Sequence, residues 1–341
     1  MRAMVLSRLA PLADEPEPLA LRDLPVPVPG ADELLVEVAA CGVCHTELDE
    51  IEGRTPPPRL PVVLGHQIVG RVRAVGSDAL AARVGERVGV GWIHRSDGSA
   101  RENLSPAFRA TGRDVDGGYA EYAIAAADYA FPVPDAFDDA EAAPLLCAGA
   151  IGHRALRLAQ IEDGQVLGLM GFGGSAHLVL QLARHRFPNA RIFAFARDPE
   201  VRAFALREGA DWAGATRDAP PAPLDAAIDT TPAWEPVVAS LAALAPGGRL
   251  VVNAIRKEER DKRALLDLSY HEHLWMEREI KSVANITGSD VREFLAEAAE
   301  IPIRPRVETY PLEDANRALR ELAAGRVRGA KVLRIGGASG R

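Results

Sequence analysis

The sequence predicts an α/β protein in which a β-rich N-terminal part is followed by a doubly wound parallel sheet. Up to about residue 134, short apolar runs are punctuated by Gly, Pro and Asp, which is typical of a mostly β region. Beyond residue 166, apolar strands alternate with helical stretches. Such alternation predicts parallel strands joined by right-handed crossovers.

The predicted elements follow the chain in order. The N-terminal strands lie at 34–38, 62–64, 69–75 and 87–90. A helix rich in Ala and Leu is predicted at 141–160 and leads into a strand at 166–170. After it we predict strands at 192–196, 226–229, 250–254 and 331–335, a turn at 246–248, and helices at 201–208, 237–244, 291–300 and 312–324. The stretch 265–280 is predicted to be helical in part, and the charged run 256–263 to be a solvated surface segment.

Composition narrows the class of function. The chain has 341 residues and a formal net charge of −8, which argues against broad attraction to nucleic acid or an anionic membrane surface. No signal-like N-terminus and no apolar stretch of about 20 residues is visible, so we expect a cytoplasmic protein with a small-molecule substrate. Three cysteines in a chain of this length do not make a disulfide framework.

A glycine-rich turn follows the predicted strand at 166–170 and opens a helix. In this context Gly171 permits the tight chain reversal and Gly173 lets backbone amides approach a pyrophosphate. Gly174 and Ser175 complete the turn, and Ala176 is the small residue that allows the helix to pack on the strand. The turn predicts a dinucleotide cofactor.

The end of the next strand bears on the choice between NAD and NADP. An NAD enzyme places an acidic residue near Ala196 to bind the adenosine ribose, but the first acid, Asp198, comes somewhat late. Arg197 instead offers a cation for a 2′-phosphate, although it could equally be an exposed surface residue or stack on adenine. We therefore favour NADP(H) over NAD(H).

The cysteines and one histidine suggest a metal site. Cys41 and Cys44 alone are ambiguous, because the pair suits a thiol redox couple, a zinc hairpin, or one ligand beside a structural cysteine. His66 and Cys147 lie far away in sequence. Two thiolates and one imidazole nevertheless make a catalytic zinc set with a fourth position open for water or substrate.

The chain resembles the zinc-containing medium-chain alcohol dehydrogenases over nearly its whole length. The motifs that carry the resemblance occur in that family's order at 41–47 (CGVCHTE), 65–66 (GH), 116–122 (DGGYAEY) and the turn at 171–176. The resemblance implies a GroES-like β-rich catalytic domain from 1–147 and 285–341, with a Rossmann NAD(P)-binding domain at 148–284 between its two segments. It also implies Cys44, His66 and Cys147 as zinc ligands.

The resemblance assigns further roles and exposes departures. Thr46 looks like the hydroxyl that moves the alcohol proton, Glu47 like the carboxylate that orients His66, and His45 like a residue near the pyrophosphate. Gln67 stands where many relatives have a glutamate beside the zinc. The stretch 93–105 contains no cysteine where many relatives hold a four-cysteine structural zinc, so we expect no second zinc.

Together these features predict a zinc-dependent alcohol dehydrogenase or aldehyde reductase acting on primary alcohols or aldehydes, with Trp92 and Ile93 as candidate pocket residues. A zinc-independent enone or quinone reductase of the same superfamily is the alternative enzyme. A cofactor-binding or redox-sensing protein that uses Cys41 and Cys44 is the alternative outside enzymes. A homodimer or homotetramer is expected from the family alone.

Overall fold

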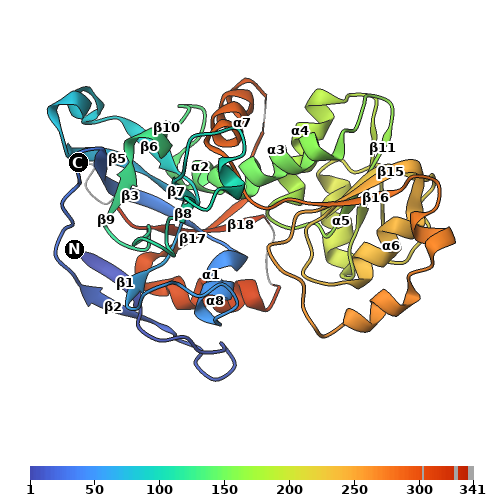
Figure 1. Ribbon diagram of the computed structural model, residues 1–341, viewed down its shortest axis with the longest axis horizontal. Helices are drawn as coiled ribbons and strands as arrows, with labels where there is room; N and C mark the ends of the chain where they lie inside the picture. Colours follow the sequence, from blue (N-terminus) through green and yellow to red (C-terminus); the bar gives the residue numbers. More distant parts are fainter. Residues whose placement is uncertain (302, 326–328, 337–341) are drawn as a thin grey trace. The chain divides into compact units, whose positions relative to one another are not determined.

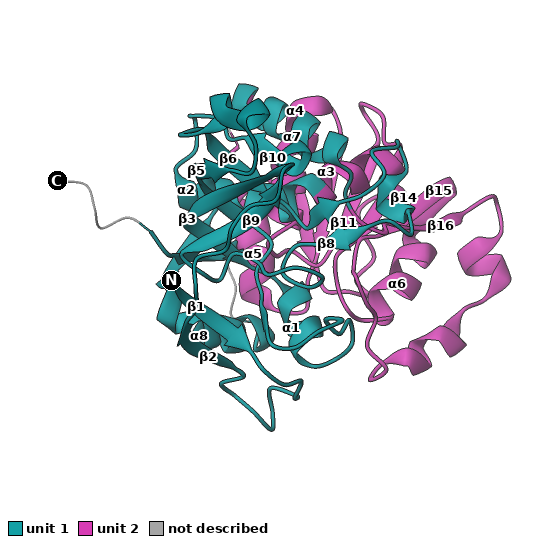
Figure 2. Cartoon of the chain, turned by 60° about the vertical axis from the view of Figure 1, so that its left-hand side comes forward, with its two compact units in different colours: residues 1–150, 286–300, 304–341 teal, residues 151–285, 301–303 magenta. Residues whose placement is uncertain are grey.

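The computed structural model describes residues 1–301, 303–325 and 329–336, which divide into two compact units (Figures 1 and 2). Unit 1 comprises 1–150, 286–300 and 304–341, and unit 2 comprises 151–285 and 301–303. Residues 302, 326–328 and 337–341 of the predicted third segment lie outside the described residues. Among the described helices, none has both the length and the apolar character needed to cross a membrane.

Unit 1 is mostly antiparallel β-structure (Figure 1). Its largest sheet has the order β10 (Ala130–Pro132), β6 (Arg87–Val90), β5 (Ile68–Val75), β3 (Glu33–Val43), β18 (Ala330–Arg334) and β17 (Val307–Pro311), and β9 (Tyr122–Ala126) also pairs with β3. Two smaller sheets have the order β2 (Leu19–Asp23), β1 (Arg2–Leu6), β4 (Val62–Val63) and β7 (Ile93–Arg95), β8 (Arg109–Ala110). The helices are α1 (His45–Ile51), α2 (Asp139–Ala142), α3 (Ala148–Ala159), which continues into unit 2, α7 (Gly288–Glu300) and α8 (Ala315–Ala323), with short 3₁₀ turns η1 (Asp78–Arg83), η2 (Glu102–Leu104), η3 (Ala127–Tyr129), η4 (Ala143–Leu146) and η7 (Leu312–Asp314).

Strand β3 is the organising strand of unit 1. It pairs with β5 and β9, and the late strand β18 adds to it antiparallel with Leu333 opposite Cys41. Alternate residues of β3, such as Leu34, Val36 and Val38, are fully buried in the apolar core. Because strand side chains alternate between two faces, this pattern fixes the register of the sheet.

Unit 2 contains the parallel sheet that the alternation of strands and helices predicts. Its order is β13 (Trp212–Gly214), β12 (Arg191–Phe195), β11 (Val166–Met170), β14 (Leu224–Asp229), β15 (Leu244–Val252) and β16 (Glu279–Ser282). The helices are α4 (Ala176–Arg186), α5 (Pro199–Arg207) and α6 (Glu235–Ala243), with the 3₁₀ turn η5 (Lys262–Asp267) and the π-helical turn η6 (Tyr270–Leu274). The chain leaves β11 towards β12 on one side and returns to β14 on the other, which is the switch point of a doubly wound sheet.

Two predicted elements differ in the structure. The single helix expected at 141–160 is broken into α2, η4 and α3, because Pro144 cannot continue an α-helix and Cys147 leaves helical geometry with φ −132° and ψ −72°. The turn expected at 246–248 is an irregularity inside β15, whose pairing with β14 jumps from Leu244 to Arg249. The helix break matters most, since it turns the Cys147 side chain out of a regular helix.

The charged run 256–263 is not simply a solvated surface segment. Arg260, Lys262 and Arg263 are exposed, but the Lys257 side chain is only 9% exposed and forms an ion pair with buried Asp229. The prediction was wrong at this lysine because composition alone does not reveal a buried carboxylate 28 residues earlier in the chain.

Candidate active site

Two of the predicted metal ligands meet because β3 and β5 are antiparallel. Cys41 lies opposite Ile68, and the backbone N–H of Gly42 donates to the carbonyl oxygen of Gln67 over 3.0 Å. The residue after β3, Cys44, and the residue before Gln67, His66, therefore lie at the same end of this strand pair. Cys44 is also the N-cap residue of α1.

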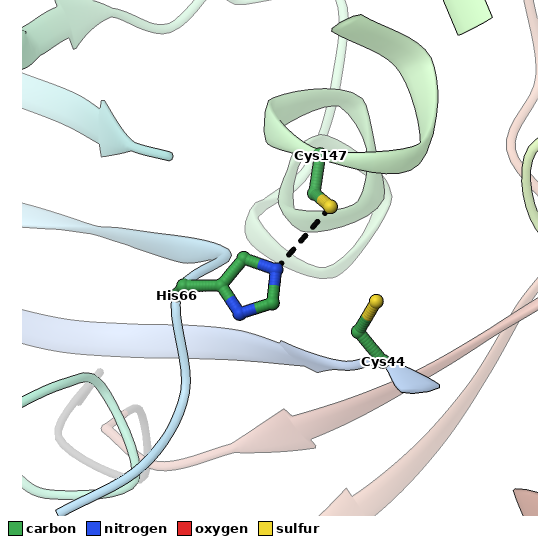
Figure 3. A group of neighbouring side chains, drawn as sticks. All are labelled: Cys44, His66 and Cys147. Carbon is green, nitrogen blue, oxygen red and sulfur yellow. Dashed lines mark hydrogen bonds between the residues drawn. The ribbon is translucent and has the colours of Figure 1, made fainter. Parts of the chain in front are cut away.

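The break between η4 and α3 brings the third residue to the same place (Figure 3). Cys44 Sγ, a His66 ring nitrogen and Cys147 Sγ all lie within 4.8 Å of one another. The His66 Nε2 atom is 3.2 Å from the Cys147 sulfur, and the His66 side chain is 1% exposed. The structure thus brings together the three residues that the sequence singled out.

The chemistry of this group fits a zinc ion. Two sulfurs and one imidazole nitrogen are the ligand types of catalytic zinc sites, which leave a fourth position open. The Glu47 carboxylate lies 2.6 Å from Nδ1 of His66 and leaves Nε2 facing the sulfurs. The hydrogen bond between the two cysteines lowers the pKa of the Cys44 thiol well below its usual range and raises that of Cys147, so Cys44 is the thiolate of the pair and Cys147 its proton donor.

The three residues that follow Cys44 in α1 differ in burial. Thr46 is buried, and its hydroxyl oxygen lies 3.6 Å from the Cys44 sulfur. Glu47 is fully buried, and its second oxygen accepts a hydrogen bond from the Cys44 backbone N–H over 2.7 Å. His45 is exposed, and its predicted place near the pyrophosphate stays a prediction.

Gln67 is buried against a glycine. A Cβ atom on Gly42 would overlap the amide of Gln67, so only glycine at position 42 leaves room for this side chain. The absence of a side chain at Gly42 therefore determines where the Gln67 amide lies.

An aromatic cluster adjoins the donor group. The Trp92 ring centroid lies 6.1 Å from that of His66 and 5.7 Å from that of Phe108, and the Arg113 guanidinium stacks over Trp92 at 5.7 Å. Trp92 therefore lies beside the imidazole of the donor group. Ile93 is fully buried in β7 and belongs to the core.

In unit 2 the glycines of the turn after β11 differ in their backbone and in their surroundings. Gly171 has φ +81°, a conformation that side-chain-bearing residues rarely adopt. A Cβ on Gly173 would meet no atom within 4 Å, so this backbone faces open space. Ala176 is fully buried at the start of α4. The backbone of Gly171 and the burial of Ala176 suit the chain reversal and the helix packing, and pyrophosphate binding at Gly173 stays a prediction.

The two residues that bear on the choice of cofactor, Arg197 and Asp198, lie between β12 and α5. The Asp198 side chain accepts a hydrogen bond from the backbone N–H of Glu200 over 2.8 Å and thereby caps α5. Arg197 is exposed. Asp198 therefore stabilises the start of α5, while the neighbouring Arg197 is exposed to solvent.

Comparison with known proteins identifies the family. An alcohol dehydrogenase GroES-like domain model matches residues 30–135, and a zinc-binding dehydrogenase model matches residues 202–333. A Mycobacterium tuberculosis (strain CDC 1551 / Oshkosh) protein named "Probable alcohol dehydrogenase AdhA" is 44% identical over 321 residues, covering 91% of either chain. The chain belongs to the zinc-binding alcohol dehydrogenase family. An oxidoreductase of the medium-chain type, as the sequence predicts, is thereby confirmed.

Solved structures of this family share both parts of the fold. Acetophenone reductase from Geotrichum candidum NBRC 4597, in complex with NAD, has a TM-score of 0.82 at 25% identity and covers 98% of this chain and 96% of its own. A zinc-binding dehydrogenase from Sinorhizobium meliloti 1021, bound to NADP, has a TM-score of 0.83 at 25% identity and covers 97% and 98%. The predicted combination of a GroES-like domain and a Rossmann sheet is confirmed.

Sequence reasoning missed one residue near the donor group of this dehydrogenase. Glu50 is fully buried, and among the described residues neither of its carboxylate oxygens has a hydrogen-bond partner. Burial, followed by the charge of Glu47, raises the pKa of Glu50 well above its usual range. Its spacing was the available signal, because residues three apart in a helix share a face, and Glu50 follows Glu47 by three.

We predict that Glu47→Gln weakens zinc binding about 10- to 100-fold, because the amide keeps the size but loses the charge that orients His66. Competition with a chromogenic chelator measures the affinity. The matched control is Glu52→Gln at the other end of α1, which should leave zinc affinity unchanged. Equal zinc affinity in Glu47→Gln and wild type would contradict the role given to Glu47.

Proposed function

We propose that this protein is a zinc-dependent alcohol dehydrogenase or aldehyde reductase that transfers hydride between NAD(P)(H) and primary alcohols or aldehydes. One observation carries the proposal: Cys44, His66 and Cys147 converge within 4.8 Å, with Glu47 against the imidazole. Unit 1 is then the catalytic domain, and unit 2, with its glycine turn, is the cofactor domain. Membership of the alcohol dehydrogenase family supports this division.

Each residue of the proposed site has a separate role in the reaction. Cys44, His66 and Cys147 would hold a zinc ion, which would supply Lewis-acid chemistry to the substrate. The Thr46 hydroxyl, 3.6 Å from the Cys44 sulfur, receives the alcohol proton in oxidation and returns it in reduction. Trp92 provides an apolar wall for the substrate. The glycine turn of unit 2 would hold the pyrophosphate of a nicotinamide cofactor, which would supply hydride in reduction and accept it in oxidation.

The alternative functions are less well supported. A zinc-independent enone or quinone reductase needs the cofactor but has no use for three convergent metal donors. A redox sensor needs two accessible thiols, but Cys41 is fully buried, and burial raises the pKa of its thiol well above the usual range. Cys41 therefore acts as a small core residue, which leaves Cys44 free to serve the metal site.

NADP(H) is the cofactor we favour. The exposed Arg197 guanidinium stands at the end of β12, where an adenosine 2′-phosphate is expected. The nearby Asp198 is engaged as the cap of α5 and is thus less available to a ribose hydroxyl group. The Sinorhizobium relative bound to NADP supports the choice, and the Geotrichum relative bound to NAD marks the alternative.

We further propose that the protein is a cytoplasmic homodimer or homotetramer. All four residues of the edge strand β16 are exposed, and an edge strand offers unpaired backbone groups to a second copy. Ile280 in this strand and Trp275 and Met276 just before it are about half exposed, so large apolar side chains gather at this edge. Three free cysteines suit a reducing compartment, and cell fractionation tests that location.

The central prediction concerns metal and turnover. Purified protein should contain about one zinc per chain and should oxidise NADPH with benzaldehyde and with a short aliphatic aldehyde. Chelation should abolish turnover, and added zinc should restore it. Elemental analysis and cofactor absorbance on the same sample measure both quantities. Metal-free protein that reduces only activated enones would instead support the zinc-independent reductase.

A second prediction tests the cofactor choice. Arg197→Ala should raise the KM for NADPH about tenfold or more, because a charged hydrogen bond to phosphate is lost, and should leave the KM for NADH nearly unchanged. Arg207→Ala, at an exposed arginine in the last turn of α5, is the matched control. A parallel rise in both KM values in Arg197→Ala would argue that the guanidinium stacks on adenine.

A third prediction tests the oligomer. Ile280→Lys should shift the protein towards monomer in sedimentation velocity, since it places a charge on the edge strand. Val28→Lys, at a residue that is 87% exposed in unit 1, should leave the sedimentation coefficient unchanged. Wild-type protein that sediments as a monomer at all concentrations would refute the assembly.

A further inference from the structure

The carboxyl end of β14 lies at the switch point of the unit 2 sheet. Met170, the last residue of β11, is directly opposite Asp229, the last residue of β14. The glycine turn continues from β11, so Asp229 stands at the sheet edge where ligands bind in doubly wound folds. An acidic residue at this edge requires an explanation, because the expected ligand carries an anionic pyrophosphate.

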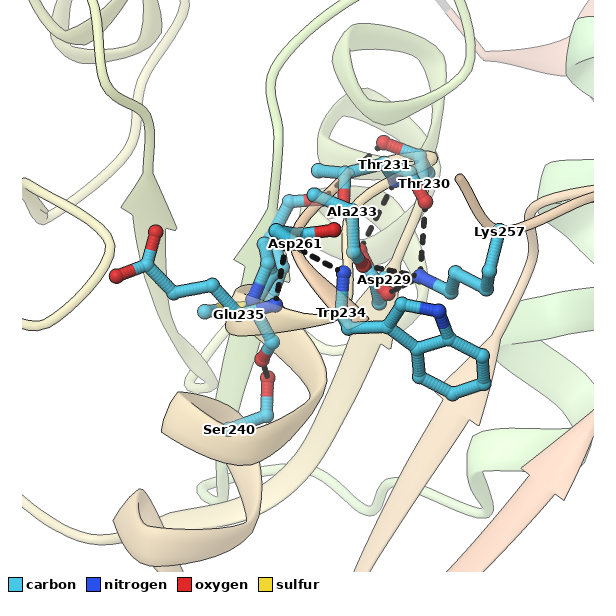
Figure 4. Close-up of polar contacts among 11 residues, drawn as sticks. Asp229, Thr230, Thr231, Ala233, Trp234, Glu235, Ser240, Lys257 and Asp261 are labelled. Atoms are coloured by element: carbon cyan, nitrogen blue, oxygen red, sulfur yellow. Dashed lines mark hydrogen bonds and ion pairs between the residues drawn. The ribbon is translucent and has the colours of Figure 1, made fainter. Parts of the chain in front are cut away.

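Asp229 is fully buried and fully partnered (Figure 4). One carboxylate oxygen accepts hydrogen bonds from the Thr231 backbone N–H at 2.9 Å and the Thr231 hydroxyl at 2.8 Å. The other pairs with the Lys257 ammonium group. Burial raises the pKa of Asp229, and the charge of Lys257 opposes that rise. The lysine therefore stabilises a carboxylate that would otherwise be costly to bury.

The same ammonium group ties down the segment after β14. Lys257 Nζ also donates to the carbonyl oxygens of Thr231 at 2.8 Å and Ala233 at 2.9 Å. These contacts and the ion pair account for the three donors of the ammonium group. Figure 4 shows Lys257 reaching across to this segment. Asp261, from the same charged run, accepts hydrogen bonds from the backbone N–H groups of Trp234 at 2.8 Å and Glu235 at 2.9 Å.

The tied segment packs directly on the glycine turn. Both the backbone N–H and the hydroxyl of Thr230 donate to the carbonyl oxygen of Met170, at 3.0 and 3.2 Å. A Cβ atom on Gly171 would lie 2.8 Å from Thr231 Cγ2 and 3.0 Å from Thr230 Oγ1. The first glycine of the turn thus rests against Thr231, whose carbonyl oxygen binds Lys257, and against its neighbour Thr230.

We propose that Lys257 is a positioning residue for the nicotinamide cofactor: it neutralises Asp229 and holds the 230–233 segment beneath the phosphate-binding turn. The proposal rests on the proposed function, since it assumes that the turn binds NAD(P)(H). Without the lysine, a buried negative charge would face the edge that receives the pyrophosphate, and the support under Gly171 would loosen. Both effects weaken cofactor binding without touching the metal donors of unit 1.

Three variants separate charge from structure. Lys257→Met removes the ammonium group but keeps an unbranched side chain of similar length. The double variant Asp229→Asn with Lys257→Met removes both charges. Lys262→Met is the matched control, because Lys262 belongs to the same charged run but is exposed and pairs with exposed Glu259.

The measurements are the Kd values for NADPH and NADH from cofactor fluorescence, the steady-state constants, the zinc content and the thermal midpoint. In Lys257→Met both Kd values should rise about tenfold or more, the cofactor KM should rise more than kcat falls, and the zinc content should not change. The double variant should recover part of the affinity, because no unpaired buried charge remains. Lys262→Met should match wild type.

Wild-type Kd values in Lys257→Met overturn the proposal, whether or not the thermal midpoint falls, because a purely structural lysine would lower only the midpoint. If Lys257→Met does not fold, the double variant decides, and wild-type cofactor affinity in that variant overturns the proposal. Wild-type protein that binds neither NADPH nor NADH refutes the proposed function itself, and the inference about Lys257 falls with it.

Discussion

The antiparallel pairing of β3 with β5 is the constraint on which the donor group depends. It places the end of one strand beside the beginning of the other, so that Cys44 and His66 meet although 21 residues separate them in the printed sequence. The pairing tolerates little change, because a Cβ on Gly42 would overlap the Gln67 amide. A register shift of one residue would also turn the buried residues of β3 towards the opposite face of the sheet. The geometry of the site thus rests on the hydrophobic register of the sheet.

Each unit uses one buried carboxylate to hold a functional element in place. In unit 1, Glu47 fixes the His66 ring and also accepts the Cys44 backbone N–H, so a single side chain positions two donors. In unit 2, Asp229 anchors Thr231 and the lysine that binds the same segment. Both carboxylates are fully buried, where a polar group is stable only with its partners in place. Loss of one partner is therefore expected to disturb the whole local arrangement.

The sequence allowed the fold class, the glycine turn and the donor residues to be predicted, because each depends on local patterns or on a motif order shared with a family. The features that could not be predicted depend on tertiary contacts. The break at Cys147 depends on Pro144 and on packing against the sheet, which helix periodicity in 141–160 does not reveal. The burial of Lys257 depends on Asp229 in a neighbouring strand, and the unpaired state of Glu50 depends on everything packed around α1. Patterns along the chain do not encode such partners.

The charge distribution around the donor group gives Gln67 a physical meaning. Both cysteines must be thiolates to bind a metal, and buried Glu47 adds a further negative charge when it is ionised. Glu50 lies in the same helix, and burial favours its neutral form. An additional carboxylate at position 67 would raise the repulsion among these groups, whereas an amide fills the same space without charge. The amide of Gln67 and the neutral form of Glu50 therefore add no negative charge beyond that of the two sulfurs when they bind a metal and of Glu47 when it is ionised.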